Sequence, residues 1–440
     1  MINTKNNSIL SKQSYNILDY GARICDSLQT PCIQKAIDDC FLNGGGQVII
    51  PSGIFRSGSL RLRSGVTLYL QCGAILMAST NPEDYCDYID DCLEPPYIPD
   101  GYDLNAGEPG YEYPFTKWHR GFIRAINAQN IAIIGEKGSY IDGLNCYDPE
   151  GEERYRGPHA ISIQYCENVL LEGYTVINSA NWAHAIFSTK EITARHLTVY
   201  GGHDGFDIRT CDNVLIEECN FHTGDDSIAG FDNCNVIIKK CILDSACSAL
   251  RFGGNNILVD SCRSISPASF AFRGSMPYER KVLSALTNVR DHHDMLTFFL
   301  YYCDYRAKIR KTPGDILIRN CEIENPDGLF ELSFDGKHRW CTNRSLSSIR
   351  FENCRVTGVK KPIHIHGDAD EPLNFELNNV QISARKGFND KPVINAVNYS
   401  QITLNNVTLS SYEAPAIHTK TDGPIYSEAS SLFEIIKDIQ

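Results

Sequence analysis

The chain has 440 residues, of which 42% are hydrophobic and 22% charged, so its composition excludes a largely disordered protein. The net charge is −13, and no basic run of the kind that marks a nucleic-acid footprint is visible in the sequence. No apolar run reaches the roughly 18 residues of a membrane span, and residues 1–16 hold no apolar stretch of secretory type. We therefore expect a cytoplasmic protein with neither a nucleic-acid nor a membrane partner.

The first element predicted along the chain is a helix within residues 32–46, CIQKAIDDCFLNGGG. Its apolar residues recur with helical spacing, and the glycines at its end are typical of a helix C-terminus. We expect this helix to cover the open apolar end of the fold that follows.

Residues 80–118 and 270–312 break the pattern of the rest and are predicted to be long loop insertions. Such loops commonly carry substrate contacts, but they could equally be decoration without a functional role.

A repeat of about 22 residues runs through the middle of the chain. Its segments are short, alternate apolar with polar residues, and are bounded by Asn, Asp or Gly, which predicts strands between turns. The first apolar residues of five segments are spaced by 23, 22, 22 and 21 residues: Val169, Ile192, Val214, Val236 and Ile257. A unit this short cannot bury a core alone, so its copies must stack. The sequence predicts an all-β fold, a parallel β-helix forming a single domain over residues 1–440.

Two residue types recur in phase with this repeat. Asn residues beside the strands suit ladders in which side-chain amides cap the turns from coil to coil. Cys219, Cys241 and Cys262 are 22 and 21 residues apart, and the 18 cysteines of the chain show no zinc-site spacing. We expect these cysteines to be reduced and stacked in the core.

An acidic cluster lies within the most regular repeats, in GGHDGFDIRT and FHTGDDSIAG. Asp204 and Asp226 are 22 residues apart, so they should stack about 4.8 Å apart, with Asp225 beside them. Carboxylates this close cannot all be ionised, and one pKa should rise. Hydrolysis of a glycosidic bond needs that asymmetry between an acid and a base. Spacing alone leaves open a second role, in which these residues cap turns or bind a cation.

At this point the sequence resembles a known family. GHDGFDI and HTGDDSIA are similar to the NTDGxD and GDDxIA motifs of glycoside hydrolase family 28, the polygalacturonases and rhamnogalacturonases. Segments such as YNILDYGA and RLRSGVTLYLQCGAIL resemble the N-terminal part of that family, so the likeness covers most of the chain. It implies a right-handed parallel β-helix with an N-terminal capping helix.

The resemblance also implies a mechanism, hydrolysis with inversion and without a metal or other cofactor. Carried over by motif position, Asp225 is the general acid. Asp204 and Asp226 hold and deprotonate the attacking water. Asp207 belongs to the same motif, and we expect it to brace the turn.

The chain departs from the family at two places. Cys247 stands where the family has the histidine of a Gly-His-Gly motif, and we expect a packing role for its thiol. The Arg-x-Lys pair that binds a uronate carboxylate is missing. Arg273 is one residue out of register and Arg251 is a second candidate for that contact. The sugar bound here is therefore either neutral or a uronate recognised by other arginines.

Further residues are predicted to bind substrate. His203 and His222 flank the aspartates and could hydrogen-bond sugar hydroxyls or tune the acid. His184 could line the same groove. Trp182 could stack on a pyranose ring or lie in the core.

Together these features predict an inverting glycoside hydrolase. Its partner would be an oligosaccharide substrate with α-glycosidic linkages, derived from pectin and containing galacturonic acid or rhamnose, and cleaved by exo action. Two alternatives stay open. One is a β-helix polysaccharide lyase, which would use Lys or Arg as base, and the other is a carbohydrate-binding β-helix without catalysis.

Overall fold

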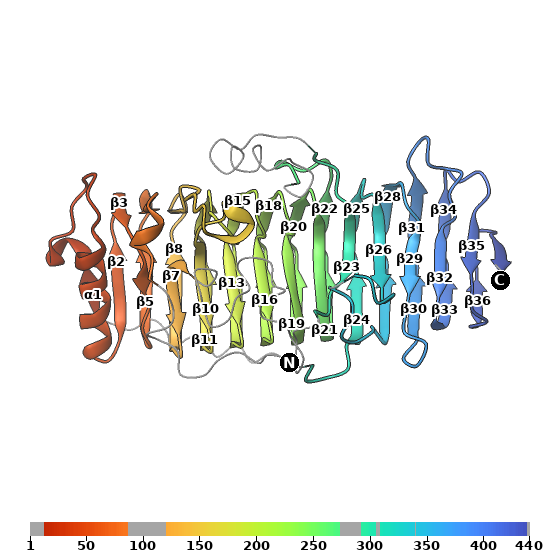
Figure 1. Ribbon diagram of the computed structural model, residues 1–440, viewed down its shortest axis with the longest axis horizontal. Coiled ribbons are helices and arrows are strands. Elements are labelled where there is room, and N and C mark those ends of the chain that lie inside the picture. Colours follow the sequence, from red (N-terminus) through yellow and green to blue (C-terminus); the bar gives the residue numbers. More distant parts are fainter. Residues whose placement is uncertain (1–12, 87–119, 273–291, 305–308, 339, 438–440) are drawn as a thin grey trace.

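The computed structural model describes residues 13–86, 120–272, 292–304, 309–338 and 340–437. Its described strands pair in parallel, each with the equivalent strand of the next coil, and together they form a parallel β-helix. Figure 1 shows the coils stacked along the long axis, from helix α1 at one end to the C-terminal strands at the other. The predicted all-β solenoid is confirmed. No helix of the described part is long and apolar enough to cross a membrane.

Each complete coil contributes one strand to each of three faces. Two long strands bend from the first face to the second: β19 (Ile228–Lys239) and β21 (Ser248–Asp260). The other strands of the first face are β4 (Leu60–Arg61), β7 (Gly121–Ile126), β10 (His159–Gln164), β13 (His184–Phe187), β16 (Phe206–Arg209), β23 (Thr297–Tyr301), β26 (Gly328–Ser333), β29 (Ile363–His366), β32 (Ile394–Val397), β35 (Ala416–Thr419) and β37 (Glu434–Lys437).

The second and third faces are built in the same way. The second face also holds β1 (Ser14–Asn16), β2 (Gly46–Ile50), β5 (Val66–Leu70), β8 (Gln129–Gly135), β11 (Glu167–Glu172), β14 (Lys190–Arg195), β17 (Asp212–Glu217), β24 (Gly314–Arg319), β27 (Ser348–Glu352), β30 (Leu373–Asn378), β33 (Tyr399–Asn405) and β36 (Ile425–Glu428). The third face holds β3 (Gly53–Ser57), β6 (Ala74–Ala78), β9 (Tyr140–Asp142), β12 (Thr175–Ile177), β15 (Thr198–Gly201), β18 (Asn220–Thr223), β20 (Ile242–Ser245), β22 (Arg263–Ile265), β25 (Glu322–Glu324), β28 (Arg355–Val359), β31 (Gln381–Ala384) and β34 (Thr408–Ser410).

The strand register follows the repeat read from the sequence. The five aligned apolar residues pair in turn with one another, and all are buried: Val169, Ile192, Val214, Val236 and Ile257. Alternate residues along these strands point into the core, so a slip by one residue would expose the whole apolar row. The core therefore fixes the register of the coils.

The predicted helix is α1 (Thr30–Leu42), which begins with Pro31 in its first turn. Its buried side chains include Ile33 and Ile37, and they pack over the first coil at the end of the solenoid. Gly44 and Gly45 follow the helix with φ values of 90° and 96°. Three short 3₁₀ helices complete the described helical elements: η2 (Ile17–Tyr20), η3 (Pro82–Asp84) and η6 (Glu152–Arg154).

Asn side chains form the expected ladders along the turns. Asn235 donates to Asn213 at 2.9 Å and accepts from Asn256 at 2.8 Å, and all three have φ of 57–58°. Left-handed backbone is tolerated by Asn because its short polar side chain bonds locally. A second ladder of the same kind joins Asn320, Asn353, Asn379 and Asn406.

The in-phase cysteines lie in the core, as predicted. Cys219, Cys241 and Cys262 are buried free thiols. Each donates to a backbone carbonyl of its own coil, at 3.3, 3.4 and 3.5 Å respectively. They contribute to packing along one line of the solenoid.

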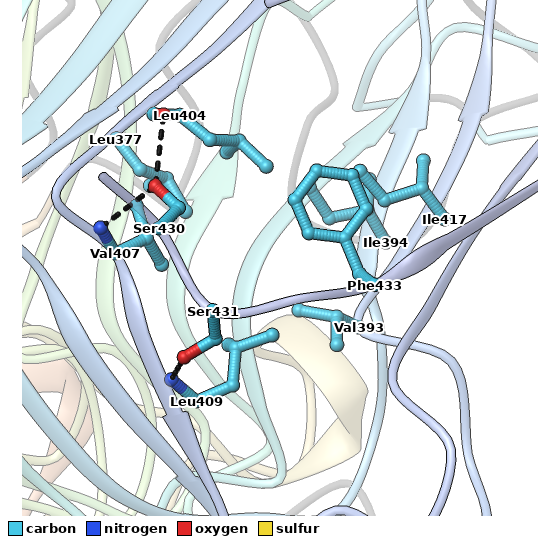
Figure 2. Close-up of a pocket in the computed structure, with 10 residues that line it drawn as sticks. All are labelled: Leu377, Val393, Ile394, Leu404, Val407, Leu409, Ile417, Ser430, Ser431 and Phe433. Carbon is cyan, nitrogen blue, oxygen red and sulfur yellow. Dashed lines mark hydrogen bonds between the residues drawn. The ribbon is translucent and has the colours of Figure 1, made fainter. Parts of the chain in front are cut away.

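The last coils are covered by the segment that leads into β37. Figure 2 shows Ser430 between neighbouring turns, where its Oγ accepts from the backbone N–H of Val407 at 3.0 Å. The Oγ of Ser431 accepts from the N–H of Leu409 at 2.8 Å. Phe433 fills the apolar end and leaves a void of about 10 Å³, which is far too small for a ligand.

The two predicted insertions are described only in part, because residues 87–119, 273–291 and 305–308 lie outside the described residues. One boundary is corrected: β23 (Thr297–Tyr301) is a regular strand of the first face, within the predicted insertion 270–312. Its segment is apolar without alternation because Phe298 and Phe299 are both buried. The sequence pattern of a half-exposed strand is therefore missing here.

Candidate active site

The predicted acidic cluster lies in neighbouring turns that lead from the third face to the first. Asp204 stands in the turn between β15 and β16, and Asp225 and Asp226 stand in the turn between β18 and β19. Phe206 pairs with Ile228, so Asp204 and Asp226 occupy equivalent positions of adjacent coils. The N–H of the residue after Asp204 donates to the carbonyl of Asp226 at 3.0 Å. The expected stacking of these two aspartates is confirmed.

Asp226 is completely buried. Its Oδ1 accepts from the backbone N–H of Ser248 at 3.1 Å, and its Oδ2 lies 3.7 Å from Nη1 of Arg251. Burial, followed by the charge of Asp225, raises the pKa of Asp226 to about 6. This carboxyl group therefore changes its protonation near neutral pH.

Asp204 is 4% exposed. Burial raises the pKa of Asp204 well above its usual value, and the carboxylates of Asp225 and Asp226 add to the effect. The guanidinium of Arg156 opposes the shift. The cluster therefore holds a proton where an isolated aspartate would have lost it.

Asp225 is the most exposed of the three aspartates, with 19% of its side chain accessible. Nη2 of Arg156 lies 3.5 Å from its Oδ2. Arg156 is itself buried and held by Oδ1 of Asn181 and Oε1 of Glu153, each at 3.3 Å. A fixed cation therefore faces this aspartate.

Sequence reasoning missed Arg156. It lies in the irregular connection between β9 and β10, where the coil repeat assigns no register to a residue. No periodic signal relates it to Asp225, and only the tertiary fold brings the two together.

Cys247 lies in the next turn, between β20 and β21. Its Sγ and carboxylate oxygens of Asp225 and Asp226 all lie within 4.8 Å of one another, the spacing of a possible metal site among the described residues. Burial, followed by the two carboxylates, raises the pKa of the Cys247 thiol well above its usual value. Metal binding and nucleophilic attack both need the thiolate, so this environment favours a packing role.

His184 is corrected as a predicted substrate-binding residue. It is completely buried, with Nε2 3.0 Å from the hydroxyl of Tyr174 and Nδ1 2.9 Å from the carbonyl of Gly205. Burial lowers the pKa of His184 to about 4. The side chain therefore supports the turn that carries Asp204 from inside the core, where no sugar reaches it.

Of the other two histidines, His203 lies in the turn beside Asp204 and His222 lies on the third face. His203 is 2% exposed and stacks on the ring of Tyr155, with centroids 6.0 Å apart. His222 points outward from β18, with Nδ1 2.7 Å from Oδ2 of Asp244, and stacks on Tyr200. Contacts of His203 and His222 with substrate stay predictions.

Arg251 projects from β21 beside the cluster. Its guanidinium lies 4.1 Å from the centroid of the Tyr302 ring, and 28% of its side chain is accessible. An aromatic face holds the cation while leaving part of it accessible. The other predicted arginine, Arg273, lies outside the described residues.

Asp207 is engaged by a neighbour on its own strand. Arg209 donates to both of its carboxylate oxygens, at 2.9 and 3.1 Å. The same guanidinium covers the ring of Trp182 at 4.5 Å, and that indole is 4% exposed. The bracing of the turn by Asp207 stays a prediction, and Trp182 is part of the packing beneath Arg209.

The geometry defines a class of protein, a parallel β-helix with three clustered carboxylates at one corner of its coils. Residues 106–246, which include all three, match the family model described as Glycosyl hydrolases family 28. The predicted resemblance is confirmed, because this segment of the chain is similar to that family.

Curated relatives agree with this resemblance. A probable polygalacturonase of Vitis vinifera is 27% identical over 232 residues, which cover 49% of this chain and 44% of the relative. An exo-poly-alpha-D-galacturonosidase of Dickeya chrysanthemi is 26% identical over 250 residues, 48% of this chain and 41% of the relative. The chain thus spans less than half the length of these two relatives.

The fold also agrees with solved structures. An exopolygalacturonase from Thermotoga maritima superposes with a TM-score of 0.59 at 18% identity, over 86% of this chain and 88% of the other. This likeness supports the β-helix architecture. At such an identity the fold alone does not define the chemistry.

Proposed function

We propose that this protein is a glycoside hydrolase that cleaves α-glycosidic linkages in galacturonic acid-containing oligosaccharides derived from pectin. The observation that carries the proposal is the stacking of Asp204, Asp225 and Asp226 at one corner of the coils, two of them buried with raised pKa values. This arrangement supplies both a proton and a carboxylate base within one small space.

Within this proposal Asp225 donates the proton to the leaving oxygen, drawing on the proton that the neighbouring carboxylates of the cluster share. It is the most exposed of the three, and Arg156 stands beside it to stabilise the negative charge that develops as the proton leaves. Asp204 and Asp226 lie on adjacent coils and hold the water between them. Attack by that water from the face opposite the leaving group inverts the anomeric centre.

The substrate class is supported by two features. Curated relatives are named as polygalacturonases, including one named as an exo-acting enzyme. The partly accessible Arg251 offers a cation to a uronate carboxylate beside Asp226. We further propose that the enzyme is exo-acting and that it also cleaves linkages next to rhamnose.

The test is product analysis in heavy-oxygen water across a panel of galacturonate and rhamnose-containing oligosaccharides. We expect saturated products that carry one labelled oxygen, with proton NMR showing that the anomer first formed is inverted. Asp225→Asn should lower the rate by at least roughly 100-fold while leaving substrate binding measurable by calorimetry.

Other outcomes would overturn the proposal. Unsaturated products that absorb in the ultraviolet would identify a lyase. Binding that is equal in wild type and Asp225→Asn, with no turnover of any oligosaccharide, would identify a carbohydrate-binding protein.

A further inference from the structure

A cavity lined in part by polar side chains lies on the first face, beyond the acidic cluster. It has a volume of about 340 Å³ and opens over β26, β29 and β32. The polar residues that line it include Glu331, Ser333, His338, Lys361, His364 and Asn395. This volume is within the range that proteins use for small ligands.

The cavity continues the same outward row of the first face that carries Arg251. Strand pairing links Arg251 to Leu300, Leu300 to Glu331, Glu331 to His364 and His364 to Asn395. Glu331 therefore stands two strands from Arg251, about 10 Å at the usual strand spacing. One oligosaccharide can contact both.

Aromatic side chains connect the cavity with Arg251 at the acidic cluster. Trp340 lies 5.8 Å from the guanidinium of Arg251, and its ring lies 5.1 Å from that of His338, which lines the cavity. The wall of the cavity is thus continuous with the surroundings of the acidic cluster.

The groups of the cavity suit hydroxyls rather than a carboxylate. Glu331 is held in place by Ser333, whose Oγ donates to its Oε1 at 3.0 Å. Burial lowers the pKa of His364, so its ring is neutral near pH 7 and both donates and accepts. The cation at this site is Lys361, an exposed side chain 3.8 Å from Oδ2 of Asp327. His338 lies 3.0 Å from Oδ1 of Asp335.

We propose that this cavity is a subsite for an uncharged sugar residue of the substrate. Glu331, His364 and Asn395 would hydrogen-bond its hydroxyls, and the Glu331 carboxylate would reject a uronate by like-charge repulsion. The inference rests on the proposed function and deepens it: the substrate carries a neutral sugar near the galacturonic acid at the cleavage site.

The test uses pairs of oligosaccharides that differ only in having a neutral sugar or a uronate at the position facing Glu331. We expect wild type to prefer the neutral member in kcat/KM. Glu331→Gln keeps the shape of the side chain and removes its charge, and should reduce that preference roughly tenfold or more. Glu322→Gln, on the exposed third-face strand β25, is the matched control and should keep it. An unchanged preference in Glu331→Gln, or a wild type that prefers the uronate, would overturn the proposal.

Binding is measured separately, by saturation-transfer NMR with neutral and uronic monosaccharides and the Asp225→Asn protein. We expect the neutral sugar to bind, and His364→Ala to abolish its signal in a protein that keeps the wild-type circular dichroism spectrum. Neutral-sugar binding that depends on Glu331 and His364, without hydrolysis of any substrate, would support the subsite while the hydrolase proposal fails. Hydrolysis with no effect of either variant would reject the subsite alone.

Discussion

At the scale of single residues, the candidate site is governed by how burial distributes protons and cations around three carboxylates. Asp204 and Asp226 lie in the interior, where the charged form is costly. The two cations at the cluster face different members, Arg156 toward Asp225 and Arg251 toward Asp226. Protonation is therefore a property of the whole cluster, set by its surroundings.

The first prediction concerns stability and pH. The pKa of Asp226 rises from 3.8 to about 6 on folding, so the folded state binds this proton more tightly than the unfolded state. Below pH 4 both states are protonated and burial of this carboxyl carries no ionisation penalty. As pH rises from 4 to 6 the penalty grows, to roughly 3 kcal/mol above pH 6.

Asp226→Asn removes that penalty, because the amide oxygen can still accept from Ser248. We expect the variant to have a higher Tm than wild type at pH 7, with the difference shrinking at pH 4, as measured by calorimetry. The exposed Asp370→Asn should behave like wild type at both values. A difference in Tm that does not depend on pH would contradict this account.

The second prediction concerns Arg156. Arg156→Met removes the cation 3.5 Å from Asp225 and the opposing charge that limits the rise in the pKa of Asp204. We expect kcat to fall roughly 10- to 100-fold, and the acidic limb of the kcat/KM profile to move to higher pH because Asp204 ionises later. Arg156→Lys should recover part of both effects. Arg154→Met, at an exposed neighbour, is the control, and a loss of rate without a change in the pH profile would point to a packing role.

At the scale of elements, the coils are held in register by repeated side chains in the turns and the core. The Asn ladder combines a left-handed backbone with amide hydrogen bonds from one coil to the next. Helix α1 and the segment around Phe433 cover the two ends of the apolar core. A solenoid needs such covers because its terminal coils lack a neighbour on one side.

The third prediction separates the two contributions of the ladder at Asn235. Asn235→Ala loses the hydrogen bonds to Asn213 and Asn256. It also leaves a non-glycine residue in left-handed backbone at φ 57°, without the polar side chain that makes this conformation tolerable for Asn. We expect it to lower the free energy of unfolding by about 1–2 kcal/mol. Asn235→Gly keeps the backbone conformation and should cost less, as judged from urea denaturation. Equal losses in the two variants would mean that the hydrogen bonds alone matter.

At the scale of the whole molecule, the solenoid arranges chemistry by stacking equivalent positions. One row of the first face carries Arg251, then Glu331 and His364 over the following coils. Residues far apart in sequence thus come to lie side by side along one row of the first face. In a β-helix, substrate specificity can therefore be changed one coil at a time.

The sequence by itself determined the solenoid, its register and the stacked aspartates, because the repeat of about 22 residues maps each residue to a fixed position on the coil. It correctly placed Asp204, Asp226 and the apolar row through Val214. The repeat predicts no position for residues in irregular connections between coils. It also does not predict which way a side chain points. Arg156 in an irregular connection was missed, and His184 was placed in the groove although its ring points into the core.

Only the tertiary structure decided the electrostatics of the site and the cavity at Glu331. Which carboxylate meets a cation, and which is buried, depends on contacts between segments that no local pattern encodes. The cavity at Glu331 is lined by strands from four coils and by the connections that carry His338 and Lys361. Register is a one-dimensional property that a repeat can carry, whereas burial and charge pairing are three-dimensional and require the packed chain.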